Sequence, residues 1–334
     1  MTAVDRERAE AIAAAAFERH GVVPADAETT ATVLVSADAR GKHSHGLLRL
    51  ERFVRGLEHG NVDPDGDIEV VRDGGGAATI SGGSRLGPVV ALEAVGEAMG
   101  RADTHGVGAV GVRDSNHLGM LGYYTEVLRE AGYVGVAMTN TEPAMPPHGG
   151  ADPVLGTNPI AVGLPTDPPF NLDMSTSAIA RGSVLRAREN GERLPEGVAL
   201  DADGEPTRDP AAALEGTIRP FGGPKGSGLA VAVEILAGGL VGAAMGEDVA
   251  GTYHTAEECT KGDLFLALDP VVLGGEGCVE RANAFLADLK DRRTAAGFDE
   301  IRLPGEASAS RADTDRITVD DDVWERVTGL ADPD

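Results

Sequence analysis

The sequence predicts an α/β protein whose N-terminal part, about sixty residues, forms a separate helical lobe. Two observations carry this prediction. Apolar residues recur with helical spacing through the N-terminal region, and beyond it short apolar strands alternate with further helical segments. A third observation concerns the core: 42% of the residues are hydrophobic but only 4% are aromatic, so Ala, Val, Leu and Ile must fill most of it.

The elements follow in order along the chain. The N-terminal region predicts helices over residues 5–20, 26–39 and 46–58, and Gly21 ends the first of them. The segment 61–84 is rich in turns with short extended pieces, and 87–102 returns to the helical period. Further strands are predicted at 107–113, 133–139, 159–165, 170–174 and 263–270. Further helices are predicted at 118–131, 177–190, 225–245, 277–296 and 320–330.

Two of these segments have unusual compositions. The helix at 225–245 is nearly all apolar and rich in small residues, so it is either the central core helix or a subunit interface. The stretch LPEGVALDADGEPTRDP, residues 194–210, is typical of a string of turns.

The charge of the chain is strongly acidic. It carries 54 acidic against 29 basic residues, a formal net charge of −25. Such a surface repels nucleic acid and anionic membranes, because binding phosphates requires a positive patch. It also repels itself at low ionic strength, whereas a Debye length of about 3 Å at 1 M salt would screen that repulsion. We therefore expect a halophilic protein that needs salt to remain folded.

The sequence gives no sign of export or of membrane insertion. The first helix carries acids and arginines early, unlike a signal peptide, and no apolar run approaches about 18 residues. Cys259 and Cys278 make neither a disulfide framework nor a zinc site. We expect a cytoplasmic protein with no nucleic-acid or membrane partner.

Gly106, Gly108 and Gly111 have the G-x-G-x-x-G spacing of a Rossmann dinucleotide site. Such a fingerprint must follow a strand and open a helix, so that the N-terminus of the helix faces the pyrophosphate. Here a helix precedes the glycines, which lie in or before the strand at 107–113. We predict a glycine-containing strand entry rather than a phosphate loop.

Two histidines are candidates for chemistry. His45 lies beside Ser44 and has Arg49 four residues on, an arrangement that pairs an acid/base with a carboxylate clamp. His117 lies where a strand ends before a helix, a favoured place for a catalytic side chain. For either residue the alternative is a histidine that only satisfies backbone groups. No chemical neighbours are seen for His20, His59, His105 and His254.

The H-x-H pair of His43 and His45 raises a metal site as a competing hypothesis. With His117 or His148 the pair would resemble a zinc site, and the protein would then be a metal hydrolase. Against this, no carboxylate or cysteine lies at a ligand spacing from the pair. A non-catalytic binding protein is the third hypothesis.

Lys225 is one of only four lysines, and it begins the apolar helix at 225–245. The helix dipole opposes a cation at that end. A phosphate resting on the helix N-terminus and held by Lys225 would satisfy both groups. The alternative is a solvated surface lysine.

Taken together, nine ordered motifs resemble the malate/L-lactate dehydrogenase family 2 over roughly residues 10–306. They include SADARGKHSHGLLRL, VRDSNHLGMLGYY, LDMSTSAIARG, PFGGPKGSGLAVAVEILAGGL and RLPGE. The resemblance implies a non-Rossmann α/β fold that assembles as a homodimer. Its mixed-sheet NAD(P)-binding domain would cover 73–269, and a mainly helical domain would combine 1–72 with 270–334.

The resemblance also implies roles for particular residues. His45 would be the acid/base and His117 the second active-site histidine, with Arg49 near the substrate carboxylate. Ser44 corresponds more loosely to this catalytic group. NAD or NADP would be bound by Asn140, Asp173, Met174, Ser175, Lys225, Gly226, Pro304, Gly305 and Glu306.

The implied activity is that of an NAD(P)-dependent dehydrogenase. It would interconvert a small 2-hydroxy acid, of the malate, lactate or sulfolactate type, and its 2-oxo acid. Reduction of a cyclic imino acid, also found in this family, is the alternative. Two departures from the family pattern bear on the substrate: His43 replaces a common acidic residue, and Phe53 replaces a common tyrosine.

Overall fold

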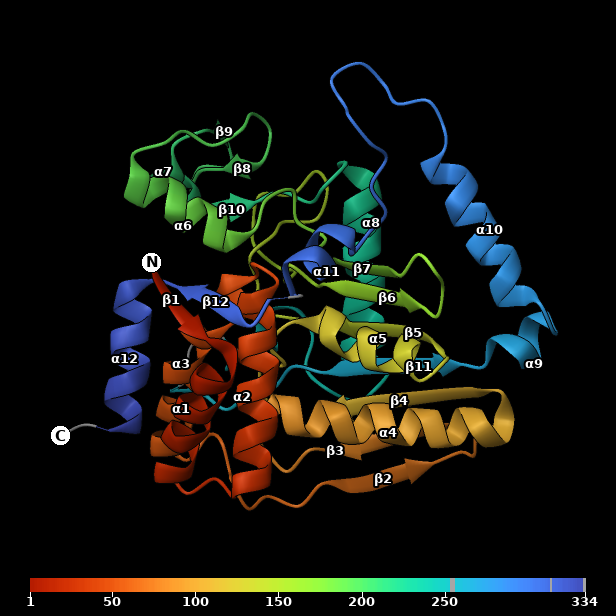
Figure 1. Ribbon diagram of the computed structural model, residues 1–334. Helices are drawn as coiled ribbons and strands as arrows, with labels where there is room; N and C mark the ends of the chain where they lie inside the picture. The colour runs from red at the N-terminus through yellow and green to blue at the C-terminus, as the bar shows by residue number, and fades with distance from the viewer. Residues whose placement is uncertain (253–255, 313, 333–334) are drawn as a thin grey trace.

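A seven-stranded sheet forms the centre of the protein in a computed structural model that describes residues 1–252, 256–312 and 314–332 (Figure 1). His254 lies outside these residues. The strand order is β2-β3-β4-β11-β5-β6-β7. The strands are β2 (Glu69–Asp73), β3 (Ala77–Ser81), β4 (Val107–Arg113), β5 (Val134–Thr139), β6 (Ile160–Leu164), β7 (Phe170–Met174) and β11 (Asp263–Leu268). Within this sheet β3 and β4 pair in parallel and the other neighbours are antiparallel, which confirms the mixed-sheet α/β fold.

Helices cover both faces of the sheet, and the alternation of side chains along the strands explains how. On β5 and β11, Ala137 and Phe265 pack in the same core cluster as α4 (Gly87–His105) and α5 (Leu121–Glu130). Their neighbours Met138 and Leu264 face the other way. They pack against α8 (Pro224–Val233) and the π-helix Glu234–Gly239 that continues it.

The helical lobe joins the two ends of the chain. Helices α1 (Arg6–Arg19), α2 (Pro24–Ala39), α3 (Leu50–His59) and α12 (Asp321–Ala331) share one apolar core (Figure 1). Strand β1 (Thr2–Asp5) pairs antiparallel with β12 (Arg316–Val319) and brings α12 against α1. The sequence did not predict either strand, because each is a four-residue segment stabilised only by pairing with the distant end of the chain.

The boundaries of four predicted helices were wrong. The helix expected at 177–190 begins at Arg181, and the helix expected at 277–296 ends at Lys290. The helix expected from residue 46 begins at Leu50, and two 3-10 turns, His43–His45 and Leu47–Arg49, precede it. The helix expected to run to 245 ends at Gly239. Three short helices were not predicted: α7 (Pro210–Glu215), α9 (Pro270–Gly274) and α11 (Glu306–Ala312).

A small third unit fills the segment predicted as turns. Three two-residue strands, β8 (Ala199–Leu200), β9 (Pro206–Thr207) and β10 (Thr217–Ile218), form a separate sheet. Helix α6 (Arg181–Asn190) packs on α7 beside it and shares a small apolar core with these strands. Among the described helices, none has both the length and the apolar character needed to cross a bilayer.

The three glycines of the G-x-G-x-x-G spacing have packing roles, as predicted. Gly106 ends α4 with a φ of +77°, which favours glycine. A Cβ on Gly108 would stand 1.9 Å from the carbonyl oxygen of Ala98, so its absence lets β4 approach α4 closely. A Cβ on Gly111 would meet Val241 at 2.5 Å. These glycines line a strand that packs between helices, and they do not open a helix.

Candidate active site

The segment between α2 and α3 forms a tight turn, which we call the catalytic turn (residues 43–49). It consists of the two 3-10 turns, and Gly46 between them is buried. The Nδ1 atom of His45 lies 2.9 Å from the hydroxyl of Ser44. Arg49 Nε donates to the carbonyl oxygen of Ser44 at 2.7 Å. Ser44, His45 and Arg49 therefore form one locally bonded group.

His117 meets this group from a different part of the chain. It follows β4, where the chain leaves the sheet before α5, as the sequence predicted. Its ring centroid lies 5.9 Å from that of His45 and 6.3 Å from that of Phe53, which it meets edge to face. The fold thus brings together the two histidines that the sequence singled out, although they lie far apart along the chain.

The hydrogen bonds of His117 fix which ring nitrogen carries its proton. The backbone N–H of Gly119 donates to His117 Nδ1 at 2.9 Å, so Nδ1 is an acceptor. In a neutral ring the proton then lies on Nε2. His117 therefore presents a hydrogen-bond donor toward any ligand beside it.

Both rings are held in the neutral form. Burial, with the charges of Arg49 and Lys42, lowers the pKa of His45 to about 3. Burial, followed by Arg49 and His45, lowers the pKa of His117 well below its usual value. At neutral pH the unliganded site therefore holds two uncharged imidazoles beside charged guanidinium groups.

A pocket of about 370 Å³, the arginine pocket, opens beside His117. Arg49 and Arg52 line it, one helical turn apart, together with Phe53 and Asn116. Arg52 is not among the residues predicted from the sequence, although its spacing from Arg49 is the signal that could have found it.

A second pocket of about 700 Å³, the β7 pocket, lies on the other side of the catalytic turn. Asp173, Pro304 and Gly305 line it, as do Lys42 and Met120. Lys42 immediately precedes the catalytic turn, and Met120 lies three residues after His117. The same two segments of chain thus contribute to both pockets; His117 lines the arginine pocket, whereas His45 is not among the residues that line either one.

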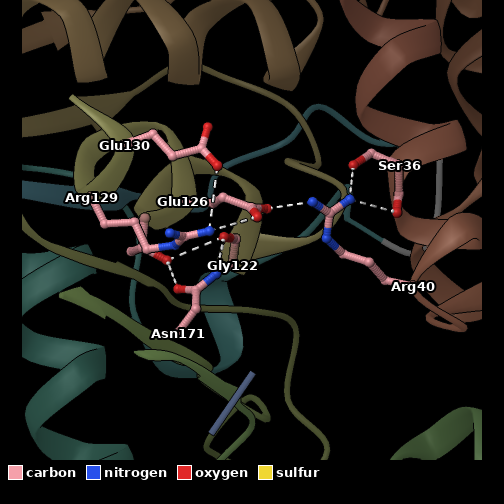
Figure 2. A network of polar contacts seen from close by, with 8 residues as sticks. Ser36, Arg40, Gly122, Glu126, Arg129, Glu130 and Asn171 are labelled. Carbon is pink, nitrogen blue, oxygen red and sulfur yellow. Dashed lines mark hydrogen bonds and ion pairs between the residues drawn. The ribbon is translucent and has the colours of Figure 1, made fainter. Parts of the chain in front are cut away.

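A network of polar contacts forms one wall of the β7 pocket (Figure 2). Arg40, at the end of α2, bonds both the carbonyl oxygen of Ser36 and the carboxylate of Glu126 on α5. Arg129 donates to the same carboxylate at 3.0 Å. The network ties the helical lobe to the sheet domain through partly buried ion pairs, with side chains 13–15% exposed.

The segment 304–305 packs against β7 at Asn171, two residues before Asp173. The backbone N–H of Asn171 donates to the carbonyl oxygen of Pro304 at 3.0 Å. Gly305 has a φ of +94° and would bring a Cβ within 2.8 Å of Asn171. Burial raises the pKa of Asp173, and the charge of Lys42 opposes that rise.

The other residues assigned to cofactor binding lie elsewhere. Met174 and Ser175 follow Asp173 but do not line the β7 pocket, and neither do Lys225 and Gly226 at the start of α8. Lys225 is exposed. Glu306 begins α11 and is bonded to Lys290 and to the backbone N–H of Leu303. Burial acts to raise the pKa of Glu306, but these bonds lower it.

Asn140 is wholly buried. Its amide donates to Glu234 at 3.0 Å and to the carbonyl oxygen of Ala244 at 2.9 Å. Its carbonyl oxygen accepts from the backbone N–H of Gly262 at 2.8 Å. These bonds engage both polar atoms, so Asn140 holds loops together rather than offering a polar atom to a ligand. Glu234, its buried partner, is not marked by any pattern in the sequence.

The H-x-H pair does not converge on one point. His43 Nδ1 donates to Asp38 at 2.8 Å, whereas His45 Nδ1 faces Ser44. Within the described ranges, no three His, Cys, Asp or Glu side chains are grouped so that they could hold a metal ion. His148 lies beside Gly223, near the start of α8. The ligand set required by the metal-hydrolase hypothesis is therefore not assembled by the described residues.

Comparison with known proteins decides the family. The model of the malate/L-lactate dehydrogenase family matches residues 4–328. The chain belongs to this family. The L-sulfolactate dehydrogenase of Methanocaldococcus jannaschii is 45% identical over 292 residues, which cover 87% of this chain and 84% of that protein. A solved structure of the sulfolactate dehydrogenase from the same organism matches with a TM-score of 0.95 and 40% identity, covering 99% and 97% of the two chains.

Further relatives in the family bear on cofactor and substrate. A (2R)-3-sulfolactate dehydrogenase (NADP(+)) of Chromohalobacter salexigens is 37% identical over 309 residues, 90% of this chain and 89% of that protein. Imino acid reductases also match. This malate/L-lactate dehydrogenase family member is therefore an NAD(P)-dependent 2-hydroxy acid dehydrogenase, with a small acid as substrate and a nicotinamide as cofactor.

Proposed function

We propose that the enzyme acts on 2-hydroxy acids with a second anionic group, of the sulfolactate or malate type. The observation that carries this proposal is the pair of arginines, Arg49 and Arg52, in one pocket beside the neutral His117. Two guanidinium groups complement a substrate with two negative charges. A local cation pair also offsets the net charge of −25, which otherwise repels such a substrate.

The catalytic roles follow from the bonding of the site. His45 takes the proton of the substrate hydroxyl during oxidation and returns it during reduction. This role requires Nδ1 to donate to Ser44, so that Nε2 is the accepting atom. Arg49 holds the carboxylate beside the reacting carbon, and His117 donates from Nε2 to the substrate oxygen. When bound, the nicotinamide takes up or supplies the hydride.

The β7 pocket fits a large cofactor. It has nearly twice the volume of the arginine pocket, and the chain segments that carry His45 and His117 contribute side chains to both. We assign Asp173, Pro304 and Gly305 to its wall, with Met174, Ser175 and Glu306 next to them in the chain. Lys225 and Gly226 are proposed to reach the cofactor from the start of α8. We give Asn140 a supporting role, since its polar atoms are engaged inside the protein.

The alternative within the family is reduction of a cyclic imino acid. Phe53 has no hydroxyl and so cannot favour either substrate by hydrogen bonding. Its side chain forms an apolar part of the pocket wall, which suits the ring of a cyclic imino acid. A cyclic imino acid of this kind has one carboxylate, whereas the pocket is lined by two guanidinium groups and by one carboxylate, that of Glu257. The second guanidinium group favours a substrate with a second anionic group.

We further propose that the enzyme is a cytoplasmic homodimer. Helix α10 (Cys278–Lys290) stands away from the body of the protein (Figure 1). Of its residues only Leu286 is buried, while Phe285 is 62% exposed. An isolated helix of this length is marginal in water. A second copy of the chain would cover this helix and the exposed apolar side chains of α9, Val271, Val272 and Leu273.

One assay tests the proposed reaction. Oxidation of NADH and NADPH is followed at 340 nm in molar salt with sulfopyruvate, oxaloacetate, pyruvate and a cyclic imine. We expect turnover of the dianionic acids well above that of pyruvate or the imine. His45→Ala should lower kcat by about 10²–10⁴, the usual contribution of general acid–base catalysis. Near-normal turnover by that variant would remove His45 from the role, and preference for the imine would favour the alternative.

A further inference from the structure

Asp38 is a buried carboxylate that accepts hydrogen bonds from two points of the catalytic turn, His43 and Leu47. It lies near the end of α2 and is 5% exposed. One carboxylate oxygen accepts from His43 Nδ1 at 2.8 Å, and the other accepts from the backbone N–H of Leu47 at 2.7 Å. His45 lies between these two points of attachment.

The turn also closes sterically onto this carboxylate. A Cβ on Gly46 would stand 2.3 Å from Asp38, far inside contact distance, so only glycine lets the turn fold around it. A carboxylate accepting two hydrogen bonds in a buried place is costly to leave unpaired. In this arrangement both carboxylate oxygens of Asp38 are paired, and they hold the turn on both sides of His45, through the ring of His43 and through the backbone N–H of Leu47.

We propose that Asp38 is a positioning residue for the acid/base His45. Asp38, with His43 and the backbone N–H of Leu47 bonded to it, forms what we call the clamp. This proposal rests on the proposed function, because it needs His45 to move the proton. General acid–base catalysis depends on placement, and a displacement of about 1 Å can cost about 10²-fold in rate. A clamp anchored at residues 43 and 47 limits such displacement.

The histidine at position 43 is suited to hold the carboxylate of Asp38. A carboxylate there would face Asp38 with like charge, whereas His43 faces it with a ring N–H. The hydrogen bond to Asp38 raises the pKa of His43, and the charge of Asp320 adds to the rise while Arg186 opposes it. Burial raises the pKa of Asp38, and the bonds to His43 and Leu47 oppose that rise.

A double-mutant cycle tests the clamp. Asp38→Asn keeps the shape of the side chain but cannot accept hydrogen bonds from both sides. We expect it to lower kcat about tenfold to a hundredfold, with the KM for NADH changed less than threefold. In the His45→Ala background the same substitution should cost less than threefold, because a residue that acts through His45 has nothing left to position.

A second variant displaces the catalytic turn from Asp38 without changing the carboxylate. Gly46→Ala leaves the carboxylate and its charge intact but forces the turn away from it, so we expect a comparable loss of kcat. Gly96→Ala is the matched control, since a Cβ there has no neighbour within 4 Å. Melting in molar salt shows whether each variant is folded.

The outcomes separate this proposal from the proposed function. If His45→Ala loses activity while Asp38→Asn and Gly46→Ala keep at least half of it, the clamp is overturned and the catalytic assignment stands. Equal losses from Asp38→Asn in both backgrounds would also overturn it, since they indicate a purely structural role. If His45→Ala retains turnover, the catalytic assignment itself fails.

Discussion

At the scale of single residues, the site is defined by two neutral histidines among fixed cations. Burial lowers the pKa of both His45 and His117, and the charge of Arg49, which is bonded to the backbone of the catalytic turn, lowers both further. A proposed base with a low pKa is ready to accept a proton over a wide range of pH. A substrate anion bound at Arg49 would offset the arginine charge and raise the pKa of His45 in the complex.

The pH dependence of oxidation follows from this. Since His45 must be neutral to accept the proton, and burial with Arg49 lowers its pKa in the free enzyme to about 3, the base form persists as pH falls through 6.5. We expect kcat/KM for hydroxy acid oxidation to be flat between pH 8 and 5.5, measured in molar salt. An inflection near pH 6.5, the ordinary value for histidine, would contradict this environment for His45.

Arg52 should decide between dianionic and monoanionic substrates. A charge-assisted hydrogen bond contributes about 1.5–3 kcal/mol. Arg52→Gln should therefore lower kcat/KM for sulfopyruvate and oxaloacetate about tenfold to a hundredfold, and that for pyruvate less than threefold. Arg55→Gln is the control: Arg55 lies on the same helix, pairs with Glu51 and is not among the residues that line the arginine pocket. Equal losses for all three acids would show that Arg52 does not distinguish the substrates.

At the scale of elements, glycines allow strands and helices to pack at short distances. Strand β4 packs against α4 because Gly108 has no side chain opposite Ala98. On the other face, α8 gives way to a π-helix at Glu234, whose carboxylate bonds Asn140 and Asn158. Such π-helices often mark functional sites. Here the irregular turn brings a buried carboxylate to the loops that follow β5.

The contact between β4 and α4 can be tested by a single methyl group. Gly108→Ala places a Cβ against the backbone of α4, so we expect a loss of about 1–3 kcal/mol in the free energy of unfolding. Gly100→Ala, on α4 with no neighbour within 4 Å, should be neutral or stabilising by about 0.5–1 kcal/mol. Urea unfolding in molar salt measures both. An unchanged midpoint for Gly108→Ala would contradict the packing role.

At the scale of the whole molecule, charge dominates the behaviour. A net charge of −25 destabilises a compact chain by self-repulsion unless salt screens it. We expect a higher melting temperature in molar salt than in low salt, measured by calorimetry at one pH. The halophilic prediction fails if the melting temperature is higher in low salt.

The proposed homodimer is also a property of the whole molecule. If a second copy covers α10, the mass measured by light scattering in molar salt should be twice 34.3 kDa. Phe285→Asp would place a charge within the covered face and shift the population toward the monomer. The control is Leu48→Asp, another exposed apolar side chain that lies on the catalytic turn rather than on α10. A wild-type monomer would remove the homodimer proposal.

The sequence by itself determined the class of fold, most strands and long helices, and the histidines that the fold brings together. The strands and helices follow from the local spacing of apolar residues. The histidines stand out because their neighbours along the chain suit acid–base chemistry. The sequence did not reveal β1 and β12, Asp38, Arg52 or Glu234. Arg52 has a local signal in its spacing from Arg49, but each of the others acts through a partner that only folding brings near. Strands β1 and β12 pair across the whole chain, and Asp38 bonds the backbone of Leu47, which lies in the turn after its helix. The tertiary structure decided these contacts, because hydrogen bonding and burial depend on distance in space and not on separation along the chain.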